Sequence, residues 1–329
     1  MRARHRLDGV EYAIKIMKKR LRPNSADEKM ALNEVFAHAA MMKDKHVVRY
    51  FNSWVEAGHL YIQNEYCEGG SLDQKINECR SGNMKFAEIE LKKLLVHLGR
   101  GLQYIHGKKL AHLDIKPENI LISYTEDEIL ASPSPSTQSP DSGAFTSDQI
   151  LITNSQYGPT KETVRYKIGD LGHVVSVHDI SNNMTGESGP MEEGDCRYMA
   201  PEFLSMDSVT RTHLPKADMF SAGLTVYEAA SLIKLPKNSE EGEEYFSLKA
   251  GVLALLPDYS SELHVILSSL VHPQPSQRPT ASRLIANPLL YPSTVKSTAQ
   301  LKRELRQQKE KVSGRAIDVI VTVIVSIVI

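Results

Sequence analysis

The stretch LAHLDIKPENILI, residues 110–122, constrains the fold of this chain more than any other stretch. It sets His112, Asp114, Lys116 and Asn119 at fixed spacing between two apolar runs. Aspartate, asparagine and proline are also common in capped turns, for backbone reasons alone. The spacing predicts a functional turn between two buried segments, and a plain capped turn is the alternative.

The composition excludes several classes of protein. The 329 residues are 41% hydrophobic and 24% charged, which is enough for a substantial core. The 39 basic and 40 acidic residues nearly balance, so charge does not favour nucleic acid or an anionic membrane. Cys67, Cys79 and Cys196 form no C-x-x-C pair, which argues against a zinc site and indicates a reducing compartment. The first thirty residues lack the apolar run of a signal peptide.

The first part of the chain alternates short strands with one helix. Residues 11–17 alternate apolar and polar side chains as a half-buried strand does. Residues 24–42 are predicted to be a helix capped by Ser25, with Glu28 three residues further on. Two strands follow, joined by a turn at residues 57–58. The side chains expected to form the apolar face of the helix are Leu32, Val35, Phe36 and Ala39.

From Gly69 onward the pattern is helical. Between residues 86 and 106, apolar side chains step by three and four positions and predict one long helix, namely Leu91, Leu94, Leu95, Leu98, Leu102 and Ile105. Further helices are predicted over residues 217–232, 260–271 and 280–286. We therefore expect an α+β fold, with a small β-rich lobe over residues 1–66 and a mainly α-helical lobe over residues 67–292.

Two segments do not have the composition of a folded core. Residues 124–163 are rich in serine, proline and acidic residues, and are predicted to be a disordered insertion. Residues 293–329 hold a charged run and end in VIVTVIVSIVI. This apolar end is too short for a spanning helix, which needs about 20 residues. The favoured interpretation is that this stretch is an alternative or spurious C-terminus, which would be prone to aggregate if exposed. A membrane tail anchor is the less favoured interpretation.

Two motifs outside the opening stretch carry residues that suit phosphoryl transfer. Lys15 lies on a predicted strand in YAIK, similar to the V-A-I-K signature whose lysine holds nucleotide phosphates. Glu34 on the following helix can pair with this lysine. Asp170 in KIGDLG corresponds to the metal-binding aspartate of D-F-G, with leucine in place of phenylalanine. Each motif alone is common, because most strand lysines are solvated and Asp-Leu-Gly turns are frequent.

The motifs together resemble a protein kinase. APE at residues 200–202 matches the A-P-E motif, and six elements occur in kinase order over about 260 residues. The resemblance implies a bilobal kinase fold that uses ATP and Mg²⁺, with Asp114 and Lys116 as catalytic residues. It implies Asn119 and Asp170 as metal ligands. Structural support is then expected from His112, Gly172, Glu202, Asp218, Gly223 and Arg278.

Longer segments resemble the Wee family of cell-cycle tyrosine kinases over about residues 5–290. They include HVVRYFNSWVEAGHLYIQNEYCEGGSL, HLDIKPENILI, KIGDLGHV and EEGDCRYMAPEFL. The resemblance implies ATP- and Mg²⁺-dependent transfer to a tyrosine of a cyclin-dependent kinase, which inhibits entry into mitosis. It also implies a nuclear protein, with a cytoplasmic pool as a further option. We expect a monomer that binds neither nucleic acid nor membrane.

The same resemblance assigns the nucleotide pocket. Glu65 and Cys67 would offer backbone hydrogen bonds to adenine, and Asn64 would control access to the space behind it. Lys15 and Glu34 would complete the ATP-binding set. An ordinary strand end followed by a Gly-Gly turn is the alternative interpretation of this segment.

Two features keep other functions open. Lys116 makes an Asp-x-Lys loop, which usually accompanies serine or threonine substrates, so serine/threonine specificity is one alternative. Gly9 is the sole glycine before Lys15, so this sequence lacks the G-x-G-x-x-G loop that covers the phosphates in kinases. We expect weaker nucleotide binding as a result. A catalytically impaired interaction module is therefore the second alternative.

Leu113 stands where the catalytic loop of most kinases carries an arginine. That arginine pairs with a phosphorylated residue of the activation segment, so we expect activity that does not depend on such phosphorylation. Internal ion pairs are expected to order the segment instead. The residues expected to make them are Glu192, Glu193, Asp195 and Arg197.

Overall fold

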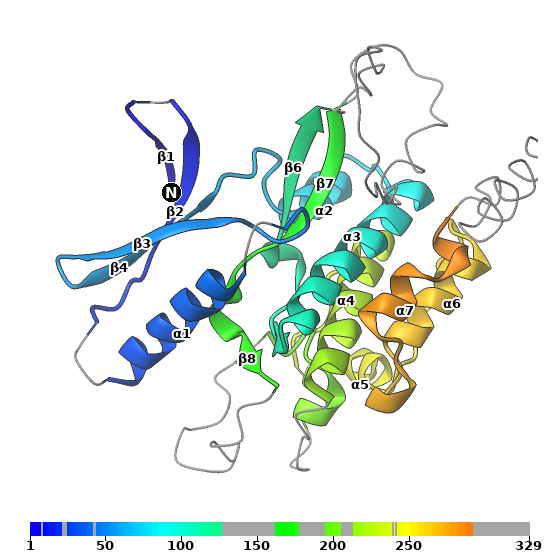
Figure 1. The fold of residues 1–329 in the computed structure, drawn as a ribbon. Coiled ribbons are helices and arrows are strands. Elements are labelled where there is room, and N and C mark those ends of the chain that lie inside the picture. The colour runs from blue at the N-terminus through cyan, green and yellow to red at the C-terminus, as the bar shows by residue number, and fades with distance from the viewer. Residues whose placement is uncertain are drawn as a thin grey trace, which may run out of the picture. The chain divides into compact units, whose positions relative to one another are not determined.

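The computed structural model describes residues 1–7, 9–21, 25–41, 44–126, 162–177, 195–204, 213–238, 240 and 242–291. Strands dominate the first part of the chain and helices the second (Figure 1). The predicted α+β class is therefore confirmed. Most of the predicted insertion and the whole charged and apolar tail lie outside the described residues.

The N-terminal lobe contains a four-stranded antiparallel sheet in the order β1-β2-β4-β3. Its strands are β1 (Arg2–Arg4), β2 (Glu11–Ile16), β3 (Tyr50–Glu56) and β4 (His59–Glu65). The predicted turn between β3 and β4 is confirmed, and its residues Ala57 and Gly58 have φ angles of 50° and 80°. Because β1 and β4 flank β2, Lys15 lies on an interior strand, paired in register with Ile62.

Helix α1 (Ala26–Ala40) begins at the predicted cap, where Ser25 Oγ accepts the Glu28 N–H at 3.2 Å. The predicted apolar face was wrong for most of its members. Phe36 is 67% exposed and Leu32 45%, and Ala39 is exposed too, whereas Glu34 and His38 are buried. The physical reason is that Glu34 must face Lys15 on the sheet, so its carboxylate rather than an apolar stripe sets the rotation of the helix.

The C-terminal lobe is built around two long helices. Helix α3 (Glu88–Gly107) buries all six side chains of the predicted stripe. Helix α4 (Leu214–Ser231) is buried at every position from Ala217 to Ala230, which makes it the centre of the lobe. Gly223 permits close packing on this helix, because a Cβ there would lie 2.8 Å from both Leu270 Cβ and Val271 Cγ1.

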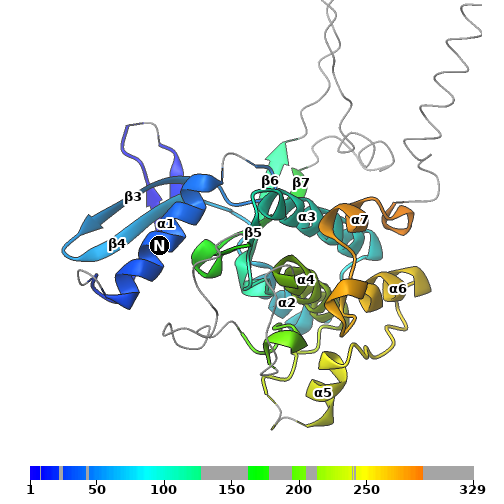
Figure 2. The same ribbon diagram turned by 60° about the horizontal axis from the view of Figure 1, so that its bottom comes forward.

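Shorter helices surround α3 and α4 (Figure 2). They are α2 (Leu72–Ser81), α5 (Glu243–Lys249), α6 (Ser261–Leu270) and α7 (Ala281–Ile285). Helices α6 and α7 match their predicted ranges to within one residue at each end, whereas α2 and α5 were not predicted. Single 3-10 turns lie at η1 (Pro117–Asn119), η3 (Leu171–His173), η4 (Pro201–Phe203), η7 (Pro275–Gln277) and η8 (Pro288–Leu290).

Two small antiparallel sheets hold the loops between the helices. One pairs β5 (Leu110–Ala111) with β8 (Val175–Ser176), and the other pairs β6 (Ile120–Glu126) with β7 (Glu162–Ile168). The second ladder reaches Glu126 and Glu162, so residues 124–126 and 162–163 of the predicted insertion are strand instead. No helix among the described residues is both long and apolar enough to cross a bilayer.

A buried histidine pair lies where β7 meets the N-terminal lobe. Ile168 N–H donates to the His46 carbonyl at 2.8 Å, and the His46 ring lies 4.4 Å from that of His97. Burial, reinforced by Arg100, lowers the pKa of His46 to about 3, and burial also lowers the pKa of His97. The His46 ring is therefore neutral in the folded protein at pH 5.

We expect the folded protein to lose stability in acid because this histidine pair is buried. Between pH 6.5 and 3 the unfolded chain protonates His46 while the folded chain does not, so acidification favours unfolding. The contribution of His46 is at most about 1.4 kcal/mol per pH unit within this window. Denaturant unfolding at pH 7, 6, 5 and 4 measures it. We expect the free energy of unfolding of His46→Leu to fall less than that of the native chain over this range. An equal fall in both chains would contradict the lowered pKa of His46.

Candidate active site

Three charged side chains from separate elements meet at the centre of the candidate site. Lys15 Nζ on β2 donates to Glu34 Oε1 on α1 at 2.7 Å and to Asp170 Oδ1 at 2.8 Å. Helix α1 also packs against η3, the turn that follows Asp170. The Glu34 side chain is buried, whereas those of Lys15 and Asp170 are each more than a third exposed. The structure therefore brings together the lysine, its expected partner and the aspartate of the DLG motif.

Burial and charge act in opposite directions on these groups. Burial alone would lower the pKa of Lys15, but the carboxylates of Asp170 and Glu34 outweigh it and raise this pKa. Burial alone would raise the pKa of Asp170, yet the Lys15 ammonium lowers it below its ordinary value. The pKa of Glu34 is lowered too, because its neighbours His38 and Lys15 outweigh burial. One cation and two carboxylates leave this cluster with a net negative charge at neutral pH.

The Asp114 carboxylate is held by two side chains of its own loop. Asn119 Nδ2 donates to Asp114 Oδ2 at 2.7 Å and to the Asp114 carbonyl at 2.9 Å. Lys116 Nζ lies 3.0 Å from Oδ1 and 2.8 Å from Oδ2 of the same carboxylate. His112 Nε2 lies 2.9 Å from the Gly169 carbonyl, and its Nδ1 accepts the Asp114 N–H at 3.3 Å. The opening motif thus orients Asp114 through Lys116 and Asn119, and links its loop to the DLG segment through His112.

The backbone before Asp114 has a strained conformation that Asp218 supports. Leu113 has a φ of 63°, in the left-handed region that is uncommon for residues other than glycine. Asp218 is fully buried on α4 and accepts the N–H groups of His112 at 2.9 Å and Leu113 at 2.7 Å. His106 Nε2 lies 2.7 Å from the same carboxylate. Asp218 thus contacts the catalytic loop through two backbone amides and the end of α3 through His106.

The DLG segment turns sharply at Asp170, which has a φ of 54°. Its Oδ1 accepts the Gly172 N–H at 3.3 Å, so the side chain stabilises its own turn. A Cβ at Gly172 would lie 3.2 Å from Asp170 Oδ1 and 3.5 Å from Glu34 Oε2. Any larger residue at position 172 would therefore crowd the carboxylates around Lys15.

The predicted nucleotide pocket contains one buried polar atom without a partner. Among the described residues, none is hydrogen-bonded to the buried Oδ1 of Asn64. Such an atom calls for a donor from water or a ligand. Glu65 N–H donates to the Arg49 carbonyl at 2.8 Å, so this amide is already used within the protein. Burial and the nearby Glu65 raise the pKa of the Cys67 thiol to about 12, so this thiol is neutral at pH 7.

The oxygen atoms of this site suit magnesium. Mg²⁺ prefers hard oxygen ligands and is usually held by one or two carboxylates together with phosphate oxygens. Asp170 supplies a carboxylate, and Asn119 leaves its amide oxygen available because its Nδ2 is used by Asp114. No cluster of three or more His, Cys, Asp or Glu side chains that could hold a metal occurs in the described part of the chain. Asp170 and Asn119 therefore fit a metal whose remaining ligands are phosphates.

Part of the predicted ion-pair network is present before the APE motif. Arg197 Nε lies 2.9 and 3.0 Å from the two oxygens of Asp195, and Arg197 Nη2 lies 3.2 Å from Glu118 Oε1. The other two residues predicted for this network, Glu192 and Glu193, lie outside the described residues. Because Glu118 belongs to η1, this arginine connects the segment directly to the catalytic loop.

Two of the residues expected to give structural support, the APE glutamate and Arg278, form an ion pair. Arg278 is 1% exposed, and its Nη1 and Nη2 each lie 2.7 Å from one oxygen of Glu202. The same guanidinium donates to three backbone carbonyls, those of Lys216, His272 and Pro273. This pair joins η4 to the turn before α7 and anchors the end of the activation segment.

Three contacts at the site had not been predicted. His173 Nδ1 lies 3.6 Å from Asp114 Oδ2, and Lys167 forms an ion pair with Glu65. Lys249 donates to the carbonyls of residues 196, 197 and 199 at 2.8, 2.9 and 2.7 Å. His173 could have been suspected from its position next to DLG. The two lysines carry no local signal, because their partners lie 50 or more residues away.

Comparison with known proteins agrees with this geometry. The protein kinase domain family matches residues 1–290, and the chain belongs to that family. Within it, the chain is related to the Wee1-like kinases. It is 40% identical over 308 residues to a Wee1-like protein kinase of Drosophila melanogaster, 39% over 307 residues to Wee1-like protein kinase 1-B of Xenopus laevis, and 40% over 306 residues to Wee1-like protein kinase 2 of Danio rerio.

These alignments cover 93, 93 and 92% of this chain but 46, 46 and 51% of the three relatives. The chain thus spans about half the length of the curated relatives it matches. The predicted family is confirmed, and so is the protein-kinase class of the fold.

Proposed function

We propose that this chain transfers the γ-phosphoryl group of Mg²⁺-bound ATP to a tyrosine of a cyclin-dependent kinase and thereby restrains entry into mitosis. The observation that carries the proposal is the Lys15 ammonium, which bridges Glu34 and Asp170 within 2.8 Å. This bridge joins the nucleotide side of the site to the metal side. The relatedness to Wee1-like kinases supports the substrate class, and with it a nuclear location.

Each residue then has a defined role. Lys15 holds the nucleotide phosphates, and Glu34 fixes the lysine in place. Asp170 and Asn119 would hold the magnesium, which would supply positive charge beside the phosphoryl oxygens. Asp114 accepts or orients the proton of the acceptor hydroxyl, and Asn119 and Lys116 keep its carboxylate aimed.

Lys116 supports a second candidate, serine/threonine specificity. Its ammonium contacts both oxygens of Asp114 and lies where an acceptor side chain must approach. A tyrosine ring needs more room there than a serine hydroxymethyl group. The side chain of Lys116 is 21% exposed, so it can leave Asp114 without disturbing a packed core. Tyrosine transfer therefore requires Lys116 to move, and serine transfer does not.

A transfer assay separates these functions. The chain is incubated with a cyclin-dependent kinase, Mg²⁺ and ATP labelled at the γ-phosphate, and label on tyrosine is compared with label on serine and threonine. We expect phosphotyrosine, and we expect EDTA to abolish it because Asp170 and Asn119 act through the metal. Label on serine alone would contradict the tyrosine assignment. Absence of label here and with a longer version extended upstream would contradict the enzyme itself.

A further inference from the structure

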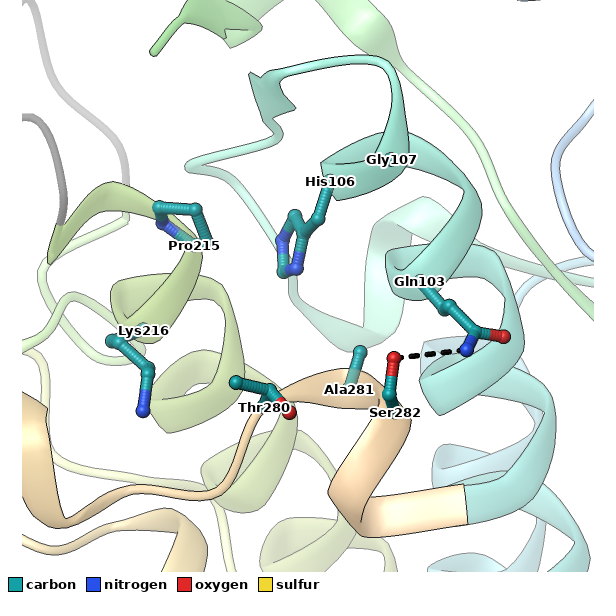
Figure 3. Close-up of a pocket in the computed structure, with 8 residues that line it drawn as sticks. All are labelled: Gln103, His106, Gly107, Pro215, Lys216, Thr280, Ala281 and Ser282. Carbon is teal, nitrogen blue, oxygen red and sulfur yellow. Dashed lines mark hydrogen bonds between the residues drawn. The ribbon is translucent and has the colours of Figure 1, made fainter. Parts of the chain in front are cut away.

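A cavity of about 320 Å³ lies where the end of α3, the start of α4 and the start of α7 meet (Figure 3). Gln103, His106, Lys216, Thr280 and Ser282 supply its polar wall. The volume is at the lower end of the range for small-ligand sites, about 300–1,000 Å³. Two wall residues contact the predicted support residues, because the Lys216 carbonyl accepts from Arg278 and His106 Nε2 lies 2.7 Å from Asp218. Gln103, Thr280 and Ser282 do not belong to the predicted kinase machinery. The cavity is therefore a candidate for a separate ligand.

Two exposed hydroxyl groups of this cavity each accept one hydrogen bond and keep a hydrogen to donate. Thr280 Oγ1 accepts the Arg283 N–H at 3.2 Å, and Ser282 Oγ accepts from Gln103 Nε2 at 2.9 Å (Figure 3). Within the described part of the chain, neither hydroxyl donates to any acceptor. Each hydroxyl has one hydrogen to donate, so both remain available to a ligand that offers oxygen acceptors.

The wall also carries a positive charge that no acid neutralises. Lys216 Nζ donates to the Arg278 carbonyl, and no carboxylate among the described residues lies within 4 Å of it. Burial lowers the pKa of Lys216, and the charges of Arg278 and Arg283 lower it further. Asp218, the carboxylate beside His106, is already used by His106 and two amides. A bound anion would relieve this repulsion between cations.

We infer that this cavity binds a phosphate group, either free phosphate or a phosphorylated side chain. A phosphate presents several strong acceptor oxygens, which matches an ammonium on α4 and two hydroxyls at the start of α7. A carboxylate presents only two oxygens in one plane and satisfies fewer of these donors. The recognising residues are Lys216, Thr280 and Ser282.

The site connects to the catalytic loop through two side chains. His106 lines the cavity, and its Nε2 lies 2.7 Å from Asp218, which in turn accepts the N–H groups of His112 and Leu113. A ligand that holds His106 in place therefore stabilises the strained backbone that precedes Asp114. We expect slower hydrogen exchange at the His112 and Leu113 amides when the cavity is filled.

Binding is tested on the full chain without any transfer reaction. Inorganic phosphate and O-phospho-L-serine are titrated separately at constant ionic strength, with saturating MgADP to cover the phosphate sites of the nucleotide cleft. Calorimetry and the unfolding midpoint report binding. We expect Lys216→Met and Ser282→Asp to weaken it at least about tenfold, because one loses a charge-assisted donor and the other adds a repelling charge.

Lys234→Met is the matched control, since this exposed lysine lies beyond the other end of α4 and loses the same charge. We expect its affinity for both probes to stay within about twofold of the native value. Tighter binding of O-phospho-L-serine assigns the site to phosphorylated side chains, and equal binding assigns it to the phosphate group alone. The inference is overturned if the native chain binds neither probe. It is also overturned if Lys216→Met and Ser282→Asp bind the probes as tightly as the native chain does. Unchanged exchange at His112 and Leu113 overturns the link to the catalytic loop, and none of these outcomes depends on phosphoryl transfer.

Discussion

Asp114→Asn is expected to lower the rate of phosphoryl transfer by about 10²- to 10⁴-fold, the usual contribution of a positioned acid or base. The substitution keeps the shape of the side chain and its contact with Asn119, but removes the carboxylate that we propose accepts the hydroxyl proton. It also removes the negative charge that holds Lys116 within 3.0 Å. Single-turnover transfer under saturating MgATP measures the rate of the chemical step.

The matched control for this substitution is Asp258→Asn. Asp258 is exposed and paired on the surface with Lys85, so the same chemical change there should leave transfer unaltered. Nucleotide affinity should change little in either variant, because Asp114 is not among the residues proposed to bind ATP. A rate within about fivefold of the native chain for Asp114→Asn would show that the proton is accepted elsewhere.

Arg278→Met is expected to destabilise the folded chain by about 3–5 kcal/mol, the usual cost of removing one partner of a buried ion pair. The change leaves the Glu202 carboxylate without its bidentate partner. It also leaves the carbonyls of Lys216, His272 and Pro273 without their donor. Urea unfolding monitored by circular dichroism at pH 7 gives the free energy of unfolding.

Two further variants make this prediction specific. Arg283→Met removes an exposed arginine five residues away and should cost within about 0.5 kcal/mol. Replacing both Arg278 and Glu202 with methionine should recover part of the loss, because no unpaired buried charge then remains. If Arg278→Met costs no more than Arg283→Met, the pair does not anchor the activation segment.

The predictions from local patterns succeeded where a single segment carries its own information. The stripe from Leu91 to Ile105 predicted α3, because burial against one neighbouring surface requires apolar residues at helical spacing. Ser25 predicted the start of α1, because a cap acts within one turn. Helix α2 was missed although Ser71 and Gln74 form a capping box, which was a readable local signal.

The face of α1 shows where local patterns fail. Phe36 and Leu32 were predicted to be buried but are exposed, while Glu34 and His38 are buried. Periodicity assumes that the core side of a helix is apolar. Here the side facing the core must deliver a carboxylate to Lys15, so an ion pair replaces the apolar stripe.

The amino-acid order by itself predicted the kinase family, the order of the motifs and the residues that make up the catalytic loop. Asp114 and Asn119 meet because they are five residues apart in one turn. Only the tertiary structure decided that Lys15 lies 2.8 Å from Asp170, although 155 residues separate them, and that a cavity beside His106 lies behind the same loop. Contacts of this kind depend on how whole elements pack, which residue spacing along one segment does not encode.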